Sequence, residues 1–267
     1  MRHLCGNDGN SGHPRLGLVS VCWTDHVARK KVTVQFCTQR GETMNAVIFD
    51  TEVNSLDHLE CIELAYRKMR ENQAGNIEVE SETTVERFKP TKPIDAGAAS
   101  VCLIAPEHLE SCRPSSEATL PEADYLIAHN VDFDCDVLGI MAGRRICTLA
   151  MCRHIWPEFK SHTLSAMFLE LEGINAANIE KIKDAHAADA DVNILIVIIG
   201  HILEKTGIKS LSELHAFSEI ARVPTVWAFG KHKGTRINET PRDYIQWMMR
   251  QPDVDQYLMK ALKSVTG

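Results

Sequence analysis

Residues 46–52 read Ala-Val-Ile-Phe-Asp-Thr-Glu, a run of four apolar residues followed by two acids that are separated by one residue. A short continuous apolar run is typical of a buried central strand, whose carboxyl end then delivers the polar residues. Because successive side chains of a strand point to opposite faces, Asp50 and Glu52 are expected on the same face. Two such carboxylates suit Mg²⁺ or Mn²⁺. Taken alone, the pattern also fits a strand end with solvated acids.

A second polar segment follows the predicted strand 125–128 and opens a predicted helix. It reads Ala128-His129-Asn130-Val131-Asp132-Phe133-Asp134. Asn and Asp at such a position are also common as helix caps. Asp132 and Asp134 are both possible metal ligands, and their spacing does not choose between them.

A third segment, 186–191, precedes an amphipathic helix predicted over 189–206. Asp191 falls in the first turn of this helix and His186 in the loop before it. A single His near a helix start is usually structural. Together with the other two segments, however, this one supplies a fourth carboxylate and a group that titrates near neutral pH.

The remaining pattern predicts an α/β fold. Strands come first, and helices and strands then alternate, which suits a mixed β-sheet flanked by helices. The early strands are expected at 46–49, 60–66 and 80–88. Later elements are the strand 125–128, the helix 132–141 and the strand 145–148, which runs into a helix before residue 156. Further helices are expected at 162–171, 189–206, 211–221, 244–249 and 254–262.

Composition restricts the class of protein. The chain has 267 residues, of which 44% are hydrophobic and 24% charged, as in a globular protein with a full core. No apolar run is long enough for a bilayer, and residues 1–17 lack the features of a signal peptide. Nine cysteines without a Cys-x-x-Cys pair indicate neither a zinc site nor a disulfide framework. We therefore expect a soluble cytoplasmic protein with no membrane partner.

The formal net charge of −7 argues against a partner as anionic as nucleic acid. Clustered carboxylates stop repelling phosphate, however, once they bind divalent cations. Basic residues also gather in the carboxyl-terminal part, where Lys231, His232 and Lys233 lie between glycines that let a backbone approach phosphate. A second nucleic-acid contact is possible there. The nearby Trp227, Phe229, Tyr244 and Trp247 are better explained as core residues.

Three parts are expected along the chain: 1–43, 44–207 and 208–267. Gly, Asn, His and Arg punctuate residues 1–43, and Met44 offers an alternative start just before the first core strand. We expect 1–43 to be a misannotated extension or a disordered tail. The last part is expected to be a small carboxyl-terminal module.

Taken together, the three acidic segments resemble the exonuclease motifs of the DEDDh 3′→5′ exonucleases, in order and at normal spacing. The matching residues are Phe49-Asp50-Thr51-Glu52, Ala128-His129-Asn130 with Phe133-Asp134, and His186 with Asp191 five positions later. Residues 146–148, 156–157, 229–234 and 244–247 further resemble exodeoxyribonuclease X and its relatives. The resemblance covers about residues 45–262. It implies a ribonuclease H-like sheet, a DEDDh exonuclease domain at 44–207 and an exodeoxyribonuclease X-like module at 208–267.

The resemblance also implies roles for individual residues. Two Mg²⁺ or Mn²⁺ ions would be held by Asp50, Glu52, Asp134 and Asp191, which selects Asp134 over Asp132. His186 would be the general base. At the substrate, Thr51 would brace the first motif, Asn130 would position it against the second, and Leu56 would lie against the terminal bases. The sequence departs from the family at 53–55, where Thr-Gly is usual, and at 101–103, where a His is common. These departures bear on substrate preference.

The activity that the resemblance implies is release of nucleoside 5′-monophosphates from DNA 3′ ends, particularly single strands, in DNA repair or recombination. In two-metal hydrolysis, ions roughly 3.5–4 Å apart clamp the attacking and leaving oxygens. His186 would take the proton of the attacking water. One alternative is an exonuclease with the same chemistry that acts on RNA ends, because no residue of the sequence indicates whether the 2′-hydroxyl of a substrate is recognised. Another is a catalytically silent nucleic-acid-binding module, which the complete carboxylate set disfavours. Oligomeric state is not indicated.

Overall fold

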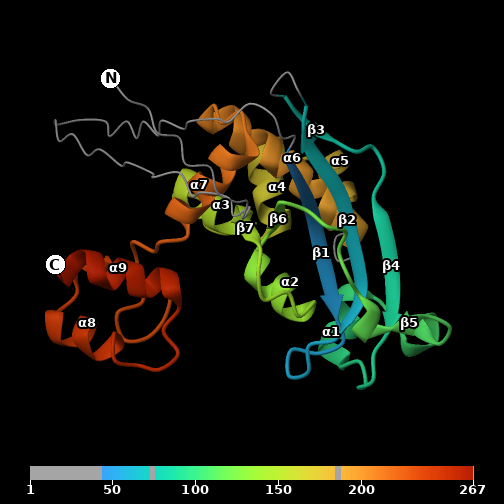
Figure 1. Ribbon diagram of the computed structural model, residues 1–267, viewed down its shortest axis with the longest axis horizontal. Helices are drawn as coiled ribbons and strands as arrows, with labels where there is room; N and C mark the ends of the chain where they lie inside the picture. The colour runs from blue at the N-terminus through green and yellow to red at the C-terminus, as the bar shows by residue number, and fades with distance from the viewer. Residues whose placement is uncertain (1–43, 73–75, 184–187, 267) are drawn as a thin grey trace, which may run out of the picture. The chain divides into compact units, whose positions relative to one another are not determined.

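A computed structural model describes residues 44–72, 76–183 and 188–266 of the chain (Figure 1). The predictions on residues 1–43 and on His186 therefore lie outside the described residues. The strands are β1 Asn45–Val53, β2 Cys61–Glu71, β3 Ile77–Val79, β4 Thr84–Lys89, β5 Arg113–Pro114, β6 Tyr125–Ala128 and β7 Arg144–Cys147. The α-helices are α1 Ala96–Cys102, α2 Val131–Val137, α3 Thr148–Ile155, α4 Leu164–Glu172, α5 Ala176–Lys183, α6 Ala188–Thr206, α7 Leu211–Ala221, α8 Arg242–Met248 and α9 Gln256–Thr266. Short 3₁₀ helices occur at Pro106–Leu109, Ser115–Glu117 and Ile237–Glu239.

Seven strands of the described ranges form one mixed β-sheet in the order β5-β4-β2-β1-β6-β7, with β3 also paired to β2. β1 pairs antiparallel with β2 on one side and parallel with β6 on the other. The next pairs outward have the same directions: β2 is antiparallel to β4, and β6 is parallel to β7. The predicted α/β fold, a mixed sheet flanked by helices, is confirmed.

Alternate residues of β1 face two separate hydrophobic clusters. Ala46 and Ile48 belong to a cluster that includes buried residues of α3, α4, α6 and α7. Val47 and Phe49 belong to a second cluster, which includes Val131 of α2. The sheet is therefore covered by α6 on one face and by α2 on the other. Side chains farther along β1 continue to point alternately toward these two faces.

Three details differ from the sequence prediction. β1 does not stop at Asp50 but continues to Val53, because backbone pairing with β2 extends to Cys61. α2 ends at Val137, four residues earlier than predicted. α1 and α5 were not predicted, since each is short and carries few buried apolar side chains.

The carboxyl-terminal helices enclose a hydrophobic cluster of their own. Its buried members include Trp227, Ile237, Ile245 and Leu262. Trp227 is fixed at its centre, where its indole N–H donates a hydrogen bond of 2.7 Å to Thr240.

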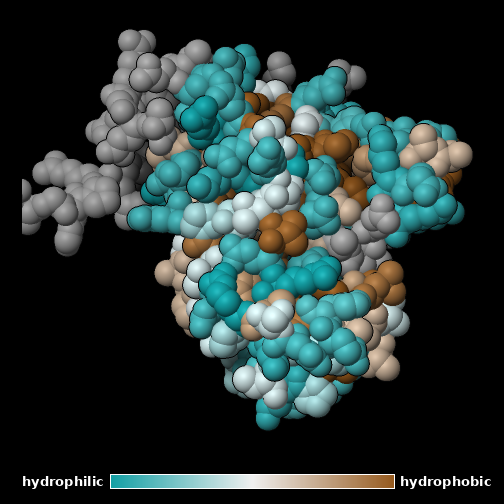
Figure 2. Space-filling view, turned by 90° about the vertical axis from the view of Figure 1, so that its right-hand side faces the viewer, coloured by the Kyte–Doolittle hydropathy of each residue, from teal (hydrophilic) through white to brown (hydrophobic). Residues whose placement is uncertain are grey.

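The molecular surface is mostly polar in the view of Figure 2, where hydrophilic residues cover much of the face and hydrophobic residues form smaller patches among them. No helix in the part of the chain that the structure describes is long and apolar enough to cross a membrane.

Candidate metal centre

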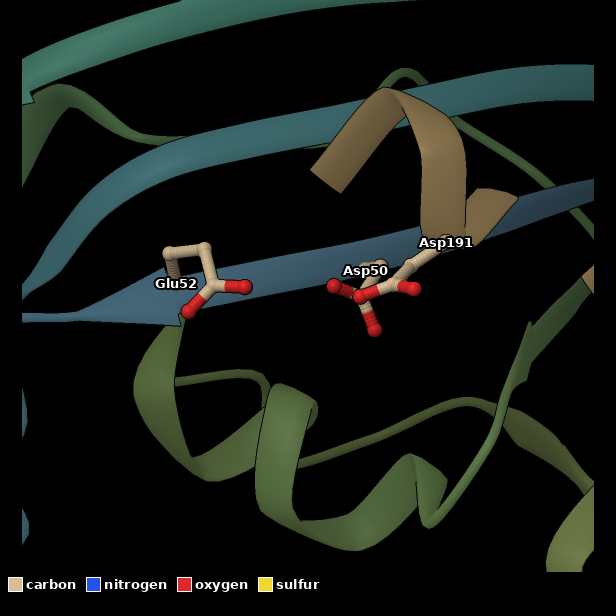
Figure 3. A group of neighbouring side chains, drawn as sticks. All are labelled: Asp50, Glu52 and Asp191. Atoms are coloured by element: carbon tan, nitrogen blue, oxygen red, sulfur yellow. The ribbon is translucent and has the colours of Figure 1, made fainter. Parts of the chain in front are cut away.

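The predicted ligands Asp50 and Glu52 meet Asp191 at the carboxyl end of β1. The strand alternation turns both β1 carboxylates toward α6, whose first turn carries Asp191. One oxygen from each of the three side chains can be chosen so that all lie within 4.8 Å of one another. Figure 3 shows Asp191 reaching from α6 toward Asp50 on β1, with Glu52 farther along the same strand. We call these three residues the acidic cluster.

The fourth predicted ligand, Asp134, lies beside this cluster and is held by the residue between the two β1 acids. Thr51 points toward α2, and both its backbone N–H and its hydroxyl donate to Asp134 Oδ1, at 3.1 and 2.8 Å. The Asp134 side chain is buried, with 3% of its residue surface exposed. Thr51 therefore fixes one oxygen of Asp134 and leaves the other available.

Asp132, the other acid that spacing allowed, is occupied elsewhere. Its carboxylate accepts a hydrogen bond of 2.8 Å from Arg145 and a further one from Arg222. Partial burial raises the pKa of Asp132, but these two hydrogen bonds outweigh it and hold the pKa below its ordinary value. Asp132 is thus an ion-pair partner, and the geometry favours Asp134 as the acid nearer the cluster.

Burial raises the pKa values of Asp50, Glu52 and Asp134, and repulsion between carboxylates adds to the effect at Asp50 and Glu52. Burial, followed by repulsion from Asp134 and Asp191, raises the pKa of Asp50 well above its ordinary value. Burial and then repulsion from Asp191 and Glu63 raise the pKa of Glu52 to about 8. The pKa of Asp134 rises to about 7 through burial, against the lowering effect of its hydrogen bonds from Thr51.

These carboxylates fit a divalent cation. Hard oxygen donors are the ligands that Mg²⁺ and Mn²⁺ prefer. The charges that raise the pKa values of Asp50 and Glu52 are those of other carboxylates, so the fold concentrates negative charge at this site. Asp50 and Glu52 are also only half-buried, which leaves the site accessible from solvent.

One buried acid beside the cluster was not predicted. Glu63 lies on β2 directly opposite Glu52, with 3% of its side chain exposed. One of its oxygens accepts a hydrogen bond of 3.0 Å from the backbone N–H of Ala188, and the other is 2.6 Å from Arg87 Nε. Glu63 therefore ties the first turn of α6, which carries Asp191, to the sheet.

The remaining predicted site residues, Asn130 and Leu56, are not members of the acidic cluster. Asn130 is the residue before α2 and has the left-handed backbone angle φ 87°, with no side-chain cap bond. Leu56 lies in the loop after β1 and is 77% exposed. That loop is anchored by Asn54, whose side-chain oxygen accepts the Glu60 N–H at 3.0 Å. Asn54 stands in one of the positions that depart from the family pattern.

His129, in the second acidic segment, has a structural environment. Its Nε2 lies 2.7 Å from the His162 carbonyl and its Nδ1 lies 3.0 Å from the Thr148 hydroxyl. Burial lowers its pKa to about 4. The ring is therefore neutral and engaged at both nitrogens, so His129 does not replace His186 as the proposed base.

Comparisons with known proteins agree with the resemblance seen in the sequence. No family model matches the chain. Exodeoxyribonuclease 10 of Escherichia coli K12 is 24% identical over 198 residues, which cover 68% of this chain and 87% of that protein. DNA polymerase III PolC-type of Streptococcus sanguinis is 26% identical over 189 residues, 63% of this chain. The match spans only 12% of that polymerase.

Among solved structures, exonuclease X in complex with 5′ overhanging duplex DNA aligns with a TM-score of 0.49. That alignment has 21% identity and covers 65% of this chain and 99% of the other. The sequence is thus similar to that of exodeoxyribonuclease 10, in agreement with the resemblance to such exonucleases that its acidic segments predicted.

Proposed function

We propose that the protein is a metal-dependent 3′→5′ exodeoxyribonuclease that releases nucleoside 5′-monophosphates from single-stranded or unpaired DNA 3′ ends. The observation that carries this proposal is the acidic cluster, in which three carboxylates from two distant segments lie within 4.8 Å. The relationship to exodeoxyribonuclease 10 supports the same activity. A role in DNA repair or recombination, in the cytoplasm, belongs to this proposal.

In this proposal Asp50, Glu52, Asp134 and Asp191 hold two Mg²⁺ or Mn²⁺ ions. When bound, such ions lower the pKa of water and offset the negative charge that builds up on a phosphate during hydrolysis. Thr51 keeps Asp134 in place through its two hydrogen bonds, and Glu63 keeps the first turn of α6 against the sheet. Asp134 and Asp191 are thereby positioned by neighbours that are not themselves ligands.

His186 is proposed to take the proton from the attacking water. The residue lies two positions before Ala188, where α6 begins, and its imidazole titrates near neutral pH in an unperturbed setting. Asn130 and Leu56 are proposed to contact the terminal nucleotide from the α2 and β1 sides of the cluster. The complete acidic set supports a working enzyme over a catalytically silent module.

The test is incubation of the protein with 5′-labelled single-stranded DNA and, separately, RNA of the same sequence. With magnesium, we expect DNA to shorten one nucleotide at a time from its 3′ end and to release 5′-monophosphates. EDTA should stop the reaction. Shortening of RNA in preference to DNA would make the protein an exoribonuclease, and binding of both without shortening would contradict the enzymatic proposal.

A further inference from the structure

The carboxyl-terminal part contains a loop with a fixed and unusual shape. Val226 and Arg236 form an isolated antiparallel bridge, and the Trp227 N–H donates to the Thr235 carbonyl at 3.0 Å. Between them, Gly230 and Gly234 have left-handed φ angles of 73° and 84°. A Cβ atom on Gly230 would also lie 2.9 Å from the Tyr244 hydroxyl. Both glycines are therefore required by the turn, and we call this segment the Gly230–Gly234 loop.

This loop presents two free cations to solvent. Lys231 and Lys233 are exposed, whereas His232 between them is half-buried, with its ring centroid 4.5 Å from that of Tyr244. Neither lysine pairs with a carboxylate among residues 44–72, 76–183 and 188–266. The histidine thus faces the module and the lysines face outward, as expected for contacts with an anionic partner.

Two aromatic side chains beside the loop are about half exposed. The sequence favoured a core role for four aromatic residues, and Trp227 fulfils it with 2% exposure. Phe229 and Trp247, however, are 53% and 47% exposed. Both line a pocket of about 620 Å³, together with Met248 and Leu258. Half-exposed rings around a pocket offer surfaces on which planar groups can stack.

The charge of this region is complementary to nucleic acid. Residues 223–267 contain seven Lys and Arg against four Asp and Glu, in a chain whose formal net charge is −7. Two of the acids, Asp253 and Asp255, line the pocket. The Asp255 carboxylate accepts the backbone N–H groups of Tyr257 and Leu258 at 2.9 and 3.0 Å. The positive charge that attracts nucleic acid therefore comes from the exposed lysines beside the pocket, not from the pocket lining.

We propose that the Gly230–Gly234 loop and the rings of Phe229 and Trp247 form a binding site for single-stranded DNA, separate from the acidic cluster. Lys231 and Lys233 contact backbone phosphates, while the two rings stack on unpaired bases. Blunt duplex DNA is a poorer ligand, because its bases are already stacked on one another. The site extends the proposed function by holding the substrate at a second position, yet its binding does not depend on cleavage.

The test measures binding of the full chain to a fluorescein-labelled single-stranded oligonucleotide by anisotropy, in EDTA so that no hydrolysis interferes. The double variant Lys231→Ala/Lys233→Ala should bind more weakly. Its plot of log affinity against log salt should be flatter by roughly 1.4, about 0.7 for each lost phosphate contact. The matched control is Lys260→Ala/Lys263→Ala, which removes two exposed lysines from α9 of the same module. An equal change of slope in this control would overturn a local site.

The rings are tested by Phe229→Ala/Trp247→Ala, which should lose roughly tenfold or more in affinity with the parental salt slope. Trp247→Tyr keeps an aromatic surface and should bind nearly as well as the parent. Thermal melting of each variant checks that it is folded. Parental affinity of the alanine variant, or equal binding of blunt duplex and single strand, would overturn the stacking role. Binding in EDTA with no cleavage in magnesium would contradict the proposed function alone.

Discussion

The acidic cluster and the Gly230–Gly234 loop carry opposite charges in opposite environments. Around Asp50 and Glu52, partial burial and neighbouring carboxylates raise the pKa values. Lys231 and Lys233 are instead exposed and unpaired within the described part of the chain. Converging like charges have a cost that a bound cation relieves, whereas exposed lysines gain little until a polyanion arrives. Changes in the cluster should therefore alter cation binding and the reaction, and changes in the loop should alter DNA affinity and its salt dependence.

The largest effect is expected from Asp191→Asn, which removes one charge from the cluster while keeping the side-chain shape. Loss of residues that merely support a metal ligand costs about 10- to 100-fold, so loss of a ligand should cost at least about 100-fold. Release of labelled mononucleotide at saturating magnesium measures this. Asp189→Asn is the matched control, because Asp189 is exposed in the same helical turn. Similar losses of activity in both variants would contradict the assignment of Asp191, and not Asp189, as the metal ligand.

His186→Ala should reduce the rate by about 10²–10⁴-fold, the usual contribution of a positioned acid–base group. The Asp191→Asn variant lacks a metal ligand and should need more magnesium. His186→Ala should reach its maximal rate at the parental magnesium concentration, because the proposed base moves a proton and holds no ion. Single-turnover cleavage across a magnesium series separates the two. If excess magnesium restores His186→Ala, or if it cleaves at the parental rate, the general-base assignment is wrong.

A smaller effect is expected at Glu63, which supports the ligand helix without belonging to the cluster. Glu63→Ala removes the acceptor for the Ala188 N–H and should lower turnover by about 10- to 100-fold. Glu63→Gln keeps an oxygen at this position and should retain more activity. Hydrogen exchange gives an independent measure, because the Ala188 amide should exchange faster in the Ala variant than in the Gln variant. Parental exchange and turnover in Glu63→Ala would exclude the positioning role.

The pKa values predict how pH affects the metal-free protein. A carboxylate whose pKa is raised on folding favours the folded state only while it is protonated, so its contribution is lost as pH rises through the raised value. For Glu52 and Asp134 that loss extends from about pH 4 to pH 8. The melting temperature in EDTA should therefore fall across this range, and less steeply in Glu52→Gln. Added magnesium should raise it more at pH 8 than at pH 6. A melting temperature that rises over this pH interval would contradict the predicted direction of the pH effect on stability.

Much of the site could be predicted because its signals are local. The spacing of Asp50 and Glu52 follows the strand period, and Asp191 falls in the first turn of an apolar helix. The choice of Asp134 over Asp132 needed the resemblance, since it depends on Thr51 and on two arginines elsewhere in the chain.

Two features had no local signal. Glu63 looks like an ordinary polar residue of an alternating strand, and its importance rests on a contact with Ala188, 125 residues away. The exposure of Phe229 and Trp247 depends on how the last helices pack, which residue type alone does not specify. Sequence therefore predicted the fold and the cluster but not the support of α6 or the exposed rings.

Binding of divalent cations by the acidic cluster can be measured by calorimetric titration of magnesium into metal-free protein near pH 7, comparing the parent with Asp50→Asn/Asp191→Asn and with the control Asp189→Asn. We expect binding with release of protons in the parent and in the control, because carboxylates with raised pKa values must ionise to bind. The double variant should lose that binding. Equal magnesium binding by the parent and the double variant would show that the acidic cluster is not the cation site.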